Sequence, residues 1–119
     1  MDVPAAIAAL LDSTRRLQSS LRQWSLLQIS ETEVSDVYVK VCTDFHIAVA
    51  ALSSYNIDMS DVMSFPQAMR DILEGCLAED ASPQVLEAFQ PRVRQTIAHL
   101  LHGLQSKQNA YQRAVRGQR

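Results

Sequence analysis

The feature that most constrains this chain is the spacing of its apolar residues, which recur every three or four positions through most of its length. That spacing gathers them on one side of an α-helix, whereas neighbouring side chains of a strand point to opposite faces. Glycine and proline, which mark most turns, number only three and four among 119 residues. Because an all-β domain needs a turn about every 8 to 12 residues, the sequence predicts an all-α fold.

Two long helices are predicted in the first half of the chain. The first runs from Val3 to about Gln28 with one apolar face. Ser30 and Glu33 have the form of a capping box, which predicts that the second helix begins there. Asn56 suits a left-handed end of that helix, and a polar turn follows. The β-branched residues of the second segment favour a strand, but their helical period takes precedence.

The second half predicts a short helix and then a long one. Ser64, with Pro66 in the first turn, opens the short helix, and Ser82 with Pro83 opens the last one. Pro91 falls inside the last helical pattern, where proline removes a hydrogen bond and clashes with the preceding turn. We therefore expect an antiparallel bundle of four to five helices whose last helix is long and kinked or broken near Pro91.

The apolar stripe of each predicted helix defines the expected core. A helix in a bundle buries one stripe and leaves its other faces in water. The residues on these stripes are Ile7, Leu10, Thr14, Leu17, Leu21, Trp24, Val34, Val37, Tyr38, Val41, Phe45, Ala48, Val49, Leu52, Tyr55, Met69, Ile72, Leu73, Cys76, Leu77, Val85, Leu86, Phe89, Val93, Ile97, Leu100, Leu101, Leu104, Tyr111 and Val115. The last two turns are polar on most sides, so the final helix should outlast the core.

A single domain is expected over residues 1–112, followed by a basic tail or the start of a linker over residues 113–119. The net charge of -2 hides an uneven distribution. Eleven of the 13 acidic residues lie between Glu31 and Glu87, and six basic residues follow Glu87 without a further acid. The basic end either steers an acidic partner or packs beside the acidic helices.

Motifs that carry catalysis or metal binding are missing from the sequence. There is no glycine-rich phosphate loop, H-E-x-x-H or G-x-S-x-G. Cys42 and Cys76 are isolated, which predicts reduced thiols without a disulfide framework or zinc site. His99 and His102 lack further ligands, and Cys42 with His46 lacks an orienting acid. We predict no enzyme, no catalytic residue, no metal and no cofactor.

The remaining polar features are interpreted as surface. Asp71 with Glu74, and Asp36 with Asp44, suit solvated helix faces better than catalytic carboxylate pairs. The basic end carries a single aromatic residue, Tyr111, and the whole chain is acidic, which argues against nucleic acid. No apolar run reaches the roughly 18 residues that cross a bilayer, and the start does not resemble a signal peptide. We expect a cytoplasmic protein without a transmembrane segment.

Six stretches follow one another in the order and spacing of a known family: Leu17 to Trp24, Val34 to Lys40, Asp44-Phe45, Asp58 to Asp61, Pro66 with Met69 to Glu74, and Leu100 to Gln108. They resemble the amino-terminal domain of the fungal actin-interacting protein 3 family, the bud-site-selection polarity factors. The resemblance covers nearly the whole chain. It implies a cytoplasmic, cytoskeleton-associated protein at the cortex or at sites of polarised growth. In that family a carboxy-terminal region binds a formin and actin monomers, so this domain would be the localising or adaptor end, linked to microtubule-end capture.

These inferences predict a non-enzymatic protein-interaction domain, with cytoskeletal or cortical polarity proteins as partners. The two candidate surfaces are a groove beside the second helix and a basic stripe formed by Arg92, Arg94, Lys107, Arg113 and Arg116. One alternative is a homodimerisation module in which the last helix acts as a strut. Another is a small enzyme or ligand carrier, which would need a pocket lined by His46, Cys42 or His99.

Overall fold

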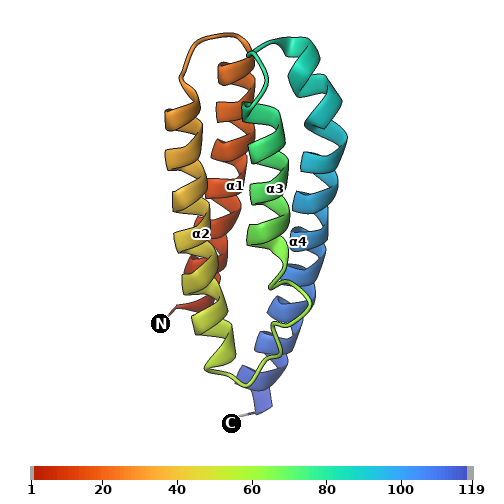
Figure 1. The fold of residues 1–119 in the computed structure, drawn as a ribbon. Helices are drawn as coiled ribbons and strands as arrows, with labels where there is room; N and C mark the ends of the chain where they lie inside the picture. The colour runs from red at the N-terminus through yellow and green to blue at the C-terminus, as the bar shows by residue number, and fades with distance from the viewer. Residues whose placement is uncertain (1, 118–119) are drawn as a thin grey trace.

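Four helices make up the part of the chain that the computed structural model describes, residues 2–117. They are α1 (Val3–Ser25), α2 (Glu31–Ser53), α3 (Phe65–Leu77) and α4 (Pro83–Gly117). Consecutive helices run in opposite directions, as Figure 1 shows. The loop between α1 and α2 and the loop between α3 and α4 therefore lie at the same end of the bundle. The predicted all-α antiparallel bundle is confirmed, with four helices.

Polar side chains within the buried stripe of α1 are satisfied inside that helix. The hydroxyls of Ser13 and Ser20 donate to the carbonyls of Leu10 and Leu17 at 3.0 and 2.7 Å. Thr14, predicted to complete the stripe, is also buried and donates to a carbonyl one turn back. Because each hydroxyl finds a partner three residues away, these positions face the core without an unpaired donor.

Helix starts follow the predicted caps with one difference. The Ser30 hydroxyl accepts the amide of Glu33 at 3.2 Å, and the Ser82 hydroxyl accepts that of Val85 at 3.1 Å. Ser64 occupies the N-cap of α3, but its side chain makes no capping hydrogen bond. Asn56 ends the turns after α2 with a φ of 60°, the left-handed conformation that asparagine tolerates. Capping residues therefore mark the helix boundaries from the sequence alone.

The last helix was predicted to be kinked or broken near Pro91, and a complete break does not occur. Helix α4 continues through Pro91, and Figure 1 shows one uninterrupted helix that curves along its length. Proline deprives the carbonyl four residues earlier of its partner, and that residue, Glu87, is exposed, as is Pro91. Water can satisfy a carbonyl on this side. Buried Val93 and Ile97 hold the next turns against the core.

The core agrees with the predicted stripes except at two positions. Leu101 and Val115 are exposed, at 40% and 42%. Conversely, Met59 and Val62 are buried, although the segment after α2 suggested a polar turn. This connection folds back onto α4, where Val62 meets Gly103. The helical period could not indicate this burial because the connection is not helical.

The helices do not close the bundle equally on all sides. The closest backbone approaches join α1 to α2, α3 to α4, and α1 to α4. The backbones of α2 and α3 lie farther apart, and large side chains such as Phe45 and Phe65 pack between them. The molecule measures 55 × 21 × 16 Å, and its long dimension is set by α4, whose 35 residues span about 52 Å at 1.5 Å per residue. None of the described helices is both long enough and apolar enough to cross a membrane.

Candidate functional site

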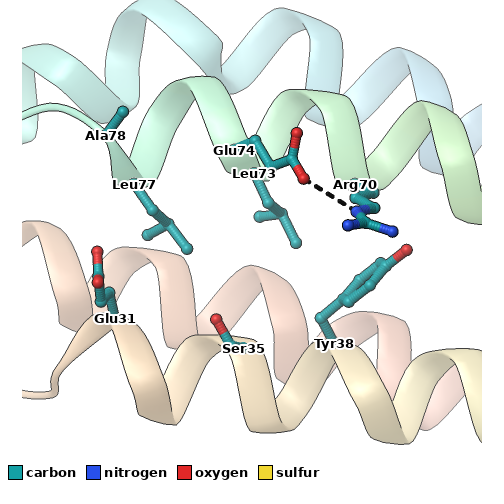
Figure 2. A pocket seen from close by; sticks show the side chains of 8 residues that line it. All are labelled: Glu31, Ser35, Tyr38, Arg70, Leu73, Glu74, Leu77 and Ala78. Atoms are coloured by element: carbon teal, nitrogen blue, oxygen red, sulfur yellow. Dashed lines mark hydrogen bonds and ion pairs between the residues drawn. The ribbon is translucent and has the colours of Figure 1, made fainter.

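The side of the bundle where α2 and α3 face each other holds a groove of about 390 Å³. Figure 2 shows its two walls, with side chains from α2 facing side chains from α3. The lining residues are Glu31, Ser35, Tyr38, Arg70, Leu73, Glu74, Leu77 and Ala78. The groove is where a surface beside the second helix was predicted, and the sequence had not indicated that α3 supplies its other wall.

Helical spacing explains the composition of each wall. Residues 31, 35 and 38 on α2 share one face, as do residues 70, 73, 74 and 77 on α3. Leu73 is 5% exposed and forms part of the core, whereas Leu77 is half-buried and points towards α2. The floor is thus apolar, and the polar residues lie along its edges.

Tyr38 closes one end of the groove. Its hydroxyl donates a hydrogen bond of 2.6 Å to the carbonyl of Pro66, in the first turn of α3. Phe45, two helical turns after Tyr38 on α2, packs its ring on that of Phe65, the residue before Pro66, with the ring centroids 5.8 Å apart. Burial, and then the neighbouring Cys42 thiol, raise the pKa of Tyr38 well above its ordinary value of 10.0. Helices α2 and α3 are therefore held together beyond Tyr38 and stand apart towards Glu31 and Ala78.

Tyr38→Phe should lower the free energy of unfolding by about 1 kcal/mol at pH 7, since one interhelical hydrogen bond is lost. The raised pKa means that the folded state favours the neutral phenol. Its contribution to stability is complete below about pH 10 and is lost as the pH rises further. Urea unfolding from pH 7 to 11 should show a shallower alkaline loss for the variant. An identical pH slope for both proteins would contradict this role.

Charged groups line the edges of the groove but interact with one another only weakly. Arg70 and Glu74 form an ion pair of 2.9 Å, but both side chains are more than 60% exposed, so the pair adds little to stability. Glu31 is exposed at the open end and has no ion-pair partner among the described residues. An open trough with an apolar floor suits a side chain of another protein better than a small enclosed substrate.

The five basic residues predicted to form a stripe do not share one face of α4. Arg92 and Arg94 are two positions apart, which places them on different sides of the helix. The Arg92 guanidinium lies 4.7 Å from the Phe89 ring centroid. Lys107 binds Asp61 at 2.7 Å and is only 12% exposed, and this contact lowers the pKa of the Asp61 carboxyl. Part of the basic end is thus used inside the fold.

The other three, Arg94, Arg113 and Arg116, are exposed and form no ion pair within residues 2–117. Arg113 and Arg116 are three residues apart and border one shallow hollow. Partner binding by these residues stays a prediction. The predicted tail over residues 113–119 continues as helix to Gly117, and residues 118–119 lie outside the described part.

The cysteines and histidines show no arrangement suited to catalysis or metal binding. Within the described residues, no three His, Cys, Asp or Glu side chains come together as a metal site. Cys42 is half-buried beside exposed His46, and Cys76 is 1% exposed, where burial raises the pKa of its thiol. His99 borders an open hollow of about 210 Å³ whose other described lining residues are not titratable.

One interpretation of the carboxylates was wrong. Asp44 is 4% exposed and accepts a hydrogen bond of 2.9 Å from Lys40, one turn earlier on α2. The pairing with Lys40 is what permits burial of the carboxylate. The other carboxylates of the two pairs, Asp36, Asp71 and Glu74, are exposed as predicted.

Comparison with known proteins adds one finding. The family model described as the Aip3p/Bud6 N-terminal domain matches residues 4–112. Searches of curated proteins and of solved structures returned no significant match. The matched range includes both walls of the groove between α2 and α3.

Proposed function

The chain belongs to the Aip3p/Bud6 N-terminal domain family of actin-interacting polarity proteins, and from this premise we propose that it is a non-enzymatic adaptor domain that localises a larger polarity factor. In this proposal the domain binds cytoskeletal or cortical proteins at sites of polarised growth. It thereby brings a formin-regulating region to the cell cortex and links it to microtubule ends.

The observation that carries the proposal is the open side of the bundle. Helices α2 and α3 are held together beyond Tyr38, while Leu77 stays partly exposed in the groove, beside Leu73 of the core. A helix or extended segment of a partner can place one apolar side chain on this floor and polar groups on the rim. Apolar side chains in an open groove lack the close contacts of a packed core, so the groove does not stabilise the free domain. Contact with a partner would supply those contacts, which supports a role in binding.

Ser35→Trp should abolish recruitment, because an indole placed on the exposed wall of α2 would fill the groove without removing any core side chain. The matched control is Thr43→Trp, an exposed position on the same helix away from the groove. The tagged domain would be followed in fungal cells at growth sites, with co-recovery of formin and microtubule-end proteins. We expect at least about a tenfold loss for the first variant and none for the control.

The same assay tests the basic residues. Arg113→Glu/Arg116→Glu alters exposed side chains only, whereas a change at Lys107 would also break its pair with Asp61. Recruitment of Ser35→Trp at the level of the unmodified chain would contradict binding through the groove. Loss of recruitment only in the arginine variant would instead favour the basic end of α4.

Homodimerisation is the alternative function, and one observation favours it. Helix α4 extends beyond Leu104, its last fully buried residue, and Val115 is exposed near its end. A second copy packed along these last turns would cover Val115 and form the predicted strut. Light scattering across a range of protein concentrations distinguishes the two functions. A molar mass that rises to that of a dimer supports homodimerisation, whereas an adaptor that binds other proteins can remain a monomer.

A further inference from the structure

The turn after α1 places a leucine in a backbone conformation that leucine disfavours. The amide of Gln28 donates to the carbonyl of Gln23 at 2.9 Å, and that of Leu27 donates to Trp24 at 3.0 Å. This pair of bonds forms a Schellman motif with Leu27 in its left-handed position, at a φ of 61°. Glycine or asparagine normally occupies this position because a larger side chain crowds the carbonyl. Packing does not account for a leucine here.

The same leucine is also the most exposed of the large apolar side chains described. Leu27 is 78% exposed and its neighbour Leu26 is 51% exposed. The pair forms an apolar tip at the end of the bundle. Two adjacent leucines in water stabilise the free domain little, and Leu27 adds backbone strain. A bound partner that covers the tip would account for both features.

The charges at this end of the bundle indicate the chemistry of that partner. Glu31 and Glu33 lie in the first turn of α2, a few residues after the tip. Glu79 and Asp80 lie in the loop between α3 and α4, at the same end (Figure 1). Because Glu31 and Ala78 line one groove, the two acidic segments are close together. None of these four carboxylates forms an ion pair among the described residues.

Arg22, in the last turn of α1, is the basic residue nearest the tip along the chain. Arg15 and Arg16 line a hollow with Glu33, but Arg16 already forms an ion pair with Asp12. Arg70 lines the groove with Glu31 and is paired with Glu74. Among the described residues, the four carboxylates without an ion pair outnumber the two nearby guanidiniums without one, Arg15 and Arg22, so this end is negative. It attracts lysine and arginine and repels the anionic surface of a membrane. The leucine pair and its acidic surroundings are thus complementary to a segment with one apolar face and flanking positive charges.

We propose that the tip formed by Leu26 and Leu27 is a second docking surface, which binds a basic amphipathic helix of a partner protein. Leu27 enters the apolar face of that helix, while Glu31, Glu33, Glu79 and Asp80 pair with its lysines or arginines. The two surfaces share Glu31, but Leu26 and Leu27 do not line the groove between α2 and α3, so a change at the leucine pair tests this surface separately.

The test uses a synthetic helical peptide of leucine and lysine, titrated into the isotopically labelled 119-residue chain and followed by NMR. Chemical shifts should change mainly at Leu26 to Gln28 and at the acidic residues around them. Leu27→Gly should weaken binding about tenfold, since a buried leucine side chain is lost from the complex. The melting temperature of the Leu27→Gly variant should rise by about 2–5 °C, because glycine adopts the left-handed backbone conformation without strain. The control Leu101→Ala, at an exposed leucine of α4, should change neither the affinity for the peptide nor which residues shift when the peptide binds.

Several results would overturn the proposal. Equal affinity of Leu27→Gly and the unmodified chain would remove the leucine as an anchor, and a lower melting temperature would show that it supports the fold. Equal binding of a leucine and glutamate peptide would remove the charge argument. Leu27-dependent binding to phosphatidylserine vesicles, without binding of the basic peptide, would show a membrane surface instead.

Discussion

Replacing Phe45 with alanine should lower the free energy of unfolding by about 3–5 kcal/mol, the usual range for removing a fully buried phenylalanine. Phe45 is 0% exposed. Its ring packs on Phe65 at a centroid distance of 5.8 Å. The expected loss is a large share of the roughly 5–15 kcal/mol that stabilises a domain.

The position of Phe45 makes the effect larger than loss of area alone. Helices α2 and α3 approach each other less closely than the other neighbouring pairs, and the packed rings of Phe45 and Phe65 join them across that distance. The hydrogen bond from Tyr38 to Pro66 should also weaken when this contact is lost.

Urea unfolding followed by far-ultraviolet circular dichroism measures this change. Phe45→Leu is the control, because it keeps most of the apolar volume and should cost less than about 2 kcal/mol. If Phe45→Ala unfolded within about 1 kcal/mol of the unmodified chain, α3 would not depend on this contact.

Gly103→Ala should destabilise the chain by about 1–2 kcal/mol, although the same change in a helix is usually favourable by about 1 kcal/mol. Gly103 is buried on α4 beneath the loop that connects α2 to α3. A Cβ atom there would lie 2.5 Å from Cγ1 of Val62, well inside contact distance. Val62 is 1% exposed and β-branched, so it has little freedom to move aside.

The rescue experiment is a double-mutant cycle with Val62→Ala. Removing the valine methyl groups should make room for the new Cβ, so the two changes together should cost less than the sum of the separate changes. Gly117→Ala serves as the control, since a Cβ atom added at that position would have no neighbouring atom within 4 Å. Additive costs in the cycle would show that the loop does not rest on Gly103.

The elements of the fold were predictable because their signals are local. The caps at Ser30 and Ser82 and the left-handed Asn56 each depend on residues within one turn. The buried stripes follow from a period of about 3.6 residues, which any packed helix shows. Pro91 was also a local signal. Whether it breaks the helix depends on which side of α4 faces water, and the residue spacing did not indicate that side.

The candidate sites were predictable only in part. A groove beside the second helix was expected, yet its second wall comes from Leu73 and Leu77 on α3. The basic residues were predicted to form one stripe, whereas Lys107 pairs with Asp61, 46 positions earlier along the chain. The turn at Leu27 was included in the first helix, because nothing in the residue type indicates a positive φ.

The sequence by itself determined the helical class, the capped starts of the helices and most of the buried positions, since each depends on hydrogen bonds and periodicity within a single helix. Only the tertiary structure decided which helices close on each other. It left α2 and α3 apart on the Glu31 side of Tyr38, folded Val62 onto Gly103 and placed four carboxylates at the same end of the bundle as an exposed leucine pair. These features arise from contacts between segments far apart along the chain, and such contacts depend on how the helices pack and not on the order of residues within any one of them.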